Sequence, residues 1–193
     1  MAEAARTLLV VLALAAPGAA LAEADARSFD ETMAWLEEQV KLHGKMYGED
    51  VGGKARNPRW FVYRVNAWGR EPCKMTVSMQ AWDLDENYRT KESHPLRDRV
   101  QSSRGTFGLG DVRPDEVTAG PLGNPKFRAF DPKTRAPVEC VGIPLKRDAM
   151  KLTGSLRRDA VFTYSRSDLC VTEKGLAERI AAAVRHLARL CGA

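Results

Sequence analysis

Ser93, His94 and Asp98 come nearest to a catalytic set in this sequence, which has 193 residues. A serine hydroxyl, an imidazole and a carboxylate can cooperate in acyl transfer when the fold brings them within hydrogen-bonding distance. Closeness in sequence does not provide that arrangement, because the three groups must converge in space. The triplet therefore supports one hypothesis, a small envelope-associated hydrolase with a site near His94.

The cysteines lack the spacing of redox or metal motifs. Four are present, and no two of them form a CxxC pair: Cys73, Cys140, Cys170 and Cys191. Thioredoxin-like, c-haem and zinc-ribbon sites depend on such close pairs. We therefore expect these residues to form disulfides, and we expect no metal ion at them.

Two further patterns fail at decisive positions. The run that starts at Asp83 supplies oxygen ligands at alternate positions, as a calcium loop does, but its sixth residue is Tyr88 and its twelfth is His94. A calcium loop needs glycine and glutamate there. The glycines of residues 105–110 match neither the dinucleotide fingerprint nor the P-loop. The sequence thus predicts no cofactor.

Basic residues exceed acidic ones, with 30 Lys and Arg against 25 Asp and Glu and a formal charge of +5. Those in two parts of the chain could form a basic surface: Lys91, Arg97, Arg99, Arg104, Lys146, Arg147, Arg157 and Arg158. An anionic envelope component is the partner that such a surface favours, and another exported protein is the alternative. Nucleic acid is disfavoured, because no aromatic residues are interleaved with these arginines.

Residues 1–22 have the organisation of a secretory signal peptide. A short N-terminal region, residues 1–6, precedes the apolar run 8–16, and small residues end at Ala22. An uncleaved anchor is the alternative, but the apolar stretch is shorter than the roughly 20 residues needed to span a bilayer. Cleavage would leave one globular domain, residues 23–193, in the periplasm or outside the cell, with no transmembrane segment.

Helical signals stand at both ends of the mature chain. Ser28 and Glu31 form a capping box, and the apolar spacing that follows predicts a helix over residues 28–43. At the other end, Thr172 is expected to cap a helix whose apolar stripe runs from Leu176 to Cys191. The histidines of these helices, His43 and His186, fall outside the apolar stripes, and we expect them to be solvated.

Strand signals lie between the helices. Residues 73–82 alternate between apolar and polar, and residues 60–67 form a second strand joined to them by a hairpin. Residues 126–130 and 136–143 flank a proline turn and predict another hairpin. Weaker candidates are residues 106–112, 116–119 and 160–164. Three tryptophans could line a ligand groove, although packing on a sheet is the commoner use: Trp60, Trp68 and Trp82.

These signals predict an α+β fold with an N-terminal helix, about seven mainly antiparallel strands and a C-terminal helix packed on them. The strands are expected to form a bent sheet or a partly closed barrel. The element order resembles that of pleckstrin-homology-like barrels; this resemblance is one of element order alone, and it implies no function. An open sheet carrying two helices is the alternative.

The predicted C-terminal helix also limits the disulfide pairing. Cys170 and Cys191 flank this helix, and about 19 residues at 1.5 Å each would separate them by roughly 28 Å. A disulfide needs Cα atoms within about 7 Å, so this pair is excluded. Cys73 and Cys191 are expected on apolar faces that share one core. Of the two remaining connectivities we favour Cys73 with Cys191 and Cys140 with Cys170.

The absence of a motif that survives inspection favours a non-enzymatic function. The sequence predicts a secreted or periplasmic, disulfide-stabilised binding or interaction module. The hydrolase with a site near His94 is the alternative hypothesis.

Overall fold

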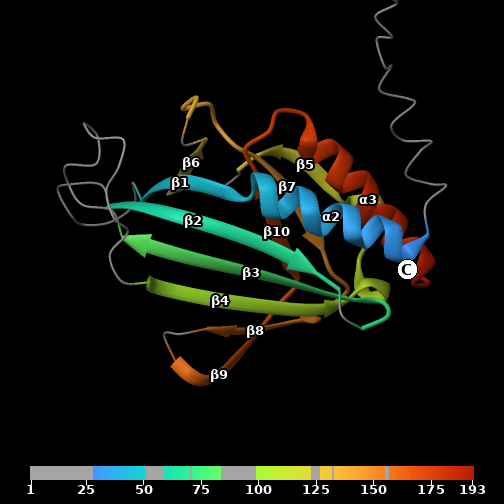
Figure 1. Ribbon diagram of the computed structural model, residues 1–193. Coiled ribbons are helices and arrows are strands. Elements are labelled where there is room, and N and C mark those ends of the chain that lie inside the picture. Colours follow the sequence, from blue (N-terminus) through green and yellow to red (C-terminus); the bar gives the residue numbers. More distant parts are fainter. Residues whose placement is uncertain are drawn as a thin grey trace, which may run out of the picture.

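The computed structural model describes residues 28–50, 59–69, 71–83, 99–122, 127–131, 133–154 and 157–193 (Figure 1). The predicted signal peptide, residues 1–22, lies outside them and stays a prediction. The described helices are α2 (Phe29–His43) and α3 (Leu176–Leu190). The described strands are β1 (Lys45–Asp50), β2 (Arg59–Trp68), β3 (Lys74–Asp83), β4 (Arg99–Gly108), β5 (Thr118–Pro121), β6 (Phe127–Phe130), β7 (Glu139–Pro144), β8 (Met150–Gly154), β9 (Arg157–Tyr164) and β10 (Arg166–Val171).

The strands form two antiparallel sheets. The larger has seven strands in the order β6-β1-β2-β3-β4-β8-β9, and the smaller has the order β10-β7-β5. Neither sheet closes on itself within the described residues. The predicted α+β class with a C-terminal helix on a sheet is therefore confirmed, and the strands form open sheets rather than a barrel. The ten described strands also exceed the seven predicted.

Helix α2 begins and ends where its local sequence signals predict. The Ser28 hydroxyl accepts a hydrogen bond from the Glu31 amide at 3.3 Å, and the Ser28 amide donates to Glu31 Oε2 at 2.9 Å. This capping box satisfies amide groups that the first turn leaves without helical partners. The buried side of the helix, with Leu36 and Val40 fully inaccessible to solvent, packs against β2.

Helix α3 packs on β7 and β5 of the smaller sheet. The predicted cap at Thr172 is wrong, because the helix begins at Leu176 after Gly175, whose φ is 76°. The Thr172 hydroxyl instead donates to the His43 carbonyl oxygen at 3.1 Å, and the Thr172 amide donates to the same atom at 3.0 Å. Thr172 therefore satisfies the end of α2 rather than the start of α3.

The hairpin predicted between residues 126–130 and 136–143 is wrong. Strand β6 pairs with β1 in the larger sheet, whereas β7 pairs with β5 and β10 in the smaller one. A single bridge between Phe130 and Pro137 joins the two segments. The turn itself forms, but Arg135 takes a φ of 62° and the chain crosses from one sheet to the other.

Most of the other predicted strands are found with small changes in their bounds. The hairpin of β2 and β3 is confirmed, with Trp68 opposite Thr76. The weaker candidates 116–119 and 160–164 correspond to β5 and β9, whereas the candidate 106–112 overlaps β4 only at residues 106–108 and continues as a 3-10 helix, Leu109–Asp111. Strands β1, β8 and β10 were not predicted, because their short sequences show no sustained alternation of apolar and polar residues.

Two disulfides join distant parts of the chain, and they are the pairing that the sequence favoured on the expected facing of Cys73 and Cys191. Cys73 and Cys191 have their Cα atoms 5.5 Å apart, and Cys140 and Cys170, which face each other on β7 and β10, have theirs 3.9 Å apart. The predicted location of Cys73, however, was wrong. Cys73 lies in the turn before β3, with a φ of 56°, rather than on the apolar face of a strand.

Candidate functional site

The residues of the hydrolase hypothesis, Ser93, His94 and Asp98, lie outside the described residues, and the hypothesis stays a prediction. Among the residues that the structure does describe, no three His, Cys, Asp or Glu side chains gather as a metal site would require.

The prediction that the helix histidines are solvated is wrong for His186, whereas His43 is partly exposed. His186 is only 7% exposed in α3. His43 Nε2 lies 2.9 Å from Glu173 Oε2, so this histidine joins the end of α2 to the segment before α3. Sequence periodicity missed both environments because they are created by packing between distant segments.

The larger sheet has an inner, apolar face and an outer, polar face. Ala67, Met75, Val77 and Phe107 are buried on the inner face, on which α2 packs. Strand side chains alternate between faces. The outer face therefore carries the following described residues other than glycine of the five strands from β2 to β9: Asn66, Trp68, Lys74, Thr76, Ser78, Gln80, Ser102, Arg104, Thr106, Lys151, Thr153 and Thr163. Eleven of these twelve have polar or charged side chains.

The register of the strands arranges these polar groups in rows across the sheet. One row runs from Trp68 through Thr76, Thr106 and Lys151 to Thr163. Within it the Thr76 and Thr106 hydroxyl oxygens are 3.0 Å apart and share a hydrogen bond. The adjacent row places Arg104 between Ser78 and Thr153. Hydroxyl, amide and cationic groups thus repeat at strand spacing, about 4.8 Å.

Arg104 forms the most specific contact of the outer face. Its guanidinium carbon lies 5.3 Å from the centre of the Trp68 ring, so the side chain reaches from β4 back over β3 to β2. Such cation–π contacts hold an arginine in place while leaving N–H groups at its edge for a ligand. Arg104 forms no ion pair with any described residue, and its charge remains available to an anion.

A second arginine stacks on aromatic rings at the β6 end of the same sheet. The guanidinium carbon of Arg135 lies 5.3 Å from the Phe130 ring centre and 5.8 Å from that of Tyr47. The two rings meet edge to face at 6.1 Å, and the residues pair across β1 and β6. Tyr47 is in register with Val62, which lies an even number of residues before Trp68 on β2. Because side chains alternate along a strand, Tyr47 is on the same, outer face as Trp68.

The turn that presents Arg135 is held by Asp131. One oxygen of this carboxylate accepts hydrogen bonds from the Lys133 amide at 2.7 Å and from the Thr134 amide at 2.6 Å. Partial burial by itself would raise the pKa of Asp131, but the Thr134 and Lys133 amides outweigh that effect and lower the pKa below its usual value. The charged carboxylate is therefore the form that the folded turn prefers.

Replacing Asp131 by alanine is expected to lower the free energy of unfolding by about 1 kcal/mol at pH 7, since the amides lose their acceptor. Because the pKa is lower in the folded protein, this contribution is present above the unfolded pKa of about 3.9 and is lost as the pH falls through the folded value. Urea titrations of both proteins between pH 7 and pH 2.5 measure it. A stability difference that is constant over this range would contradict the role of the carboxylate.

The charges of the outer face are mainly positive. Besides Arg104 and Lys151, the exposed basic residues at its strand positions are Lys45, Lys74 and Arg128, of which Lys74 pairs with Glu71. The described strand register places one acidic residue on this face, Glu49, opposite Arg128. The face therefore favours anions.

The basic surface predicted from the sequence differs from this one. Of its residues, Arg104 is on the outer face, while Lys146 donates to the Gly110 carbonyl oxygen at 3.0 Å in a loop and the exposed Arg147 follows it. The side chains of Lys91, Arg97, Arg99, Arg157 and Arg158 lie outside the described ones, as do those of Trp60 and Trp82. The alternation of Thr76, Ser78 and Gln80 along β3 was the signal that could have identified the polar face.

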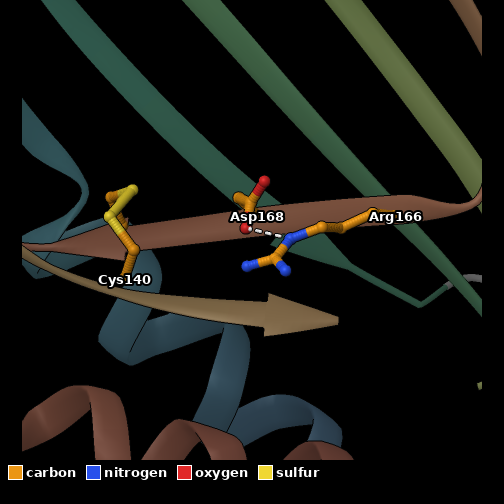
Figure 2. The surroundings of a disulfide bond; sticks show 4 residues. Cys140, Arg166 and Asp168 are labelled. Atoms are coloured by element: carbon orange, nitrogen blue, oxygen red, sulfur yellow. Dashed lines mark hydrogen bonds and ion pairs between the residues drawn. A yellow bond between two sulfur atoms is a disulfide. The ribbon is translucent and has the colours of Figure 1, made fainter. Parts of the chain in front are cut away.

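The smaller sheet presents a different polar pair near its disulfide (Figure 2). Arg166 Nε donates to Asp168 Oδ1 at 2.9 Å on β10, and both side chains are exposed. A Cβ added at Gly142 would clash with Arg166 Nη2, so the absent side chain makes room for the guanidinium. Because Asp168 neutralises this arginine, the pair is a poorer anion site than Arg104.

No protein-family model, curated protein or solved structure matches this chain. Neither of the two described helices has an apolar stretch long enough to cross a membrane. The function proposed below is therefore based on the cationic, hydroxyl and amide groups of the outer face.

Proposed function

We propose that this protein is an exported, non-enzymatic binding module whose outer face binds an anionic, hydroxyl-rich polymer of the cell envelope. Two disulfides and a leader-like N-terminus support export, because disulfides persist in oxidising compartments. An acidic polysaccharide has the required chemistry, since it carries carboxylate or phosphate groups as well as many hydroxyls.

The contact between Arg104 and Trp68 carries this proposal. The ring orients the guanidinium at 5.3 Å over an exposed sheet, where no described carboxylate competes for it. Around it, hydroxyl and amide groups on neighbouring strands can both donate and accept hydrogen bonds, as sugar hydroxyls require. An anionic group would bind Arg104 and Lys151 while the sugar hydroxyls bind the row that includes Thr76 and Thr106.

Replacing Arg104 by glutamine is expected to weaken binding of polygalacturonate, a soluble polymer of acidic sugars, at least about tenfold, because a hydrogen bond to a charged group is lost. Isothermal titration at low salt measures the affinity. Arg179→Gln is the matched control, since Arg179 also stacks on a tryptophan at 5.3 Å, Trp35, but on the helices. The control should bind as tightly as the wild type.

Neutral dextran separates charge recognition from general sugar binding, and it should not bind. Added salt should weaken the binding of polygalacturonate, because exposed charges are screened. Equal affinities of Arg104→Gln and the wild type would overturn the proposal. Binding confined to vesicles of anionic phospholipid, with none to the polymer, would also overturn it and assign the face to a lipid surface.

A further inference from the structure

We infer that the polymer lies across the strands of the outer face, with an anionic group at each of Arg104 and Lys151. Its path is the cross-strand row, which consists of residues in register on β2, β3, β4 and β8: Trp68, Thr76, Thr106 and Lys151. This inference rests on the proposed function and deepens it, because it assigns the ligand a direction and a spacing between its charges.

The cross-strand row has a cation at each end. The Arg104 guanidinium lies over the Trp68 ring at 5.3 Å, and it is therefore at the β2 end of the row. Lys151 is on β8, three strand spacings from β2. At about 4.8 Å for each spacing, the strand positions of Trp68 and Lys151 are about 14 Å apart. An extended chain that carries more than one anionic group can therefore bind both cations at once.

Both cations have exposed side chains, and neither forms an ion pair with a described residue. The remaining described cation of strands β2 to β9 on this face, Lys74, differs because its ammonium group pairs with Glu71. The acidic residue of the face, Glu49, is on β1, outside the strands that the row crosses. The row thus presents two positive charges that an anionic chain can neutralise.

Between the two cations, Thr76 and Thr106 form a pair of hydroxyls. Their oxygens are 3.0 Å apart, and either hydroxyl can be the donor. One hydroxyl hydrogen is used in this bond, so the other remains to donate to a ligand, and the oxygens keep further acceptor capacity. A sugar hydroxyl also donates and accepts, so it matches this pair. The row therefore fits a chain that carries hydroxyls between its anionic groups.

Two exposed lysines of the same face test the direction of the chain. Lys151→Gln removes a cation from the row, whereas the matched control Lys45→Gln removes one from β1, outside the row. Isothermal titration compares a short oligogalacturonate, which covers one cation, with a long one, which spans the row. The wild type and Lys45→Gln should bind the long oligomer about a hundredfold more tightly than the short one, because the second contact is intramolecular. Lys151→Gln should lose this gain.

Thermal melting checks that both variants are folded. If Lys151→Gln keeps the gain, the chain does not reach Lys151, and the inference is refuted. A gain that both variants lose would indicate general attraction to the face and would also refute a path across the strands, as would equal affinities of the wild type for the two lengths. In each of these cases, weaker binding by Arg104→Gln would leave the proposed function standing. If no oligomer binds to the wild type, the proposed function itself fails.

Discussion

Replacing Cys73 and Cys191 together by alanine is expected to lower the free energy of unfolding by about 5 kcal/mol. The disulfide closes a loop with a sequence separation of 118 residues, and removing it restores that loop's entropy to the unfolded chain. It also frees the end of α3 from the turn before β3. Urea unfolding under non-oxidising and non-reducing conditions measures the change.

The second disulfide supplies the comparison for this prediction. Cys140 and Cys170 are separated by 30 residues, so the same chain-entropy model predicts a smaller loss, about 4 kcal/mol, for their double alanine variant. A larger loss for this pair would show that its position between β7 and β10 outweighs loop length. Free thiols at Cys73 and Cys191 in non-reducing peptide mapping of the wild type would contradict the structure.

Replacing Leu36 by alanine is expected to lower the free energy of unfolding by about 2–5 kcal/mol. The Leu36 side chain is completely buried on α2, in the core shared with β2. Truncation removes methyl groups from an apolar environment and leaves a cavity that the surrounding elements fill only in part. Chemical denaturation monitored by circular dichroism measures the loss.

Leu42→Ala is the matched control for Leu36→Ala. It removes the same atoms from the same helix, but the Leu42 side chain is 63% exposed. We expect a change within about 0.5 kcal/mol, since exposed positions away from special features tolerate substitution. Equal losses for the two variants would mean that α2 does not pack on the sheet through its Leu36 side.

Local signals predicted α2 well. The hydrogen bonds of its cap join residues three apart, and its apolar stripe follows the helical period, so both can be identified without knowledge of the rest of the chain. The alternation along β3 is equally local. For the same reason the sequence showed that Thr76, Ser78 and Gln80 share one face.

Partner choice between strands could not be predicted in the same way. Strands β6 and β7 flank a turn that suits a hairpin, yet they join different sheets. The turn residues determine where the chain bends, but the pairing depends on which apolar surfaces are buried together. Strands β1, β8 and β10 are short and acquire their regularity from neighbours, which explains why their sequences alone did not identify them.

In the candidate site, too, the residue types could be identified from the sequence, but the contacts between them could not. Arg104 was recognised as basic, but its stacking on Trp68 joins residues 36 positions apart in the sequence through the register of three strands. Likewise, Arg135 meets Tyr47 only because β6 lies beside β1. Neither contact produces a periodic pattern in the sequence.

The sequence alone predicted the α+β class, the terminal helices and the central hairpin, because these depend on short-range periodicity, and the length of the C-terminal helix excluded one of the three cysteine pairings. The tertiary structure alone decided which strands share a sheet and which face of it carries aligned arginines and aromatic rings. These features depend on strand register, which is set by the burial of apolar residues far apart in the chain.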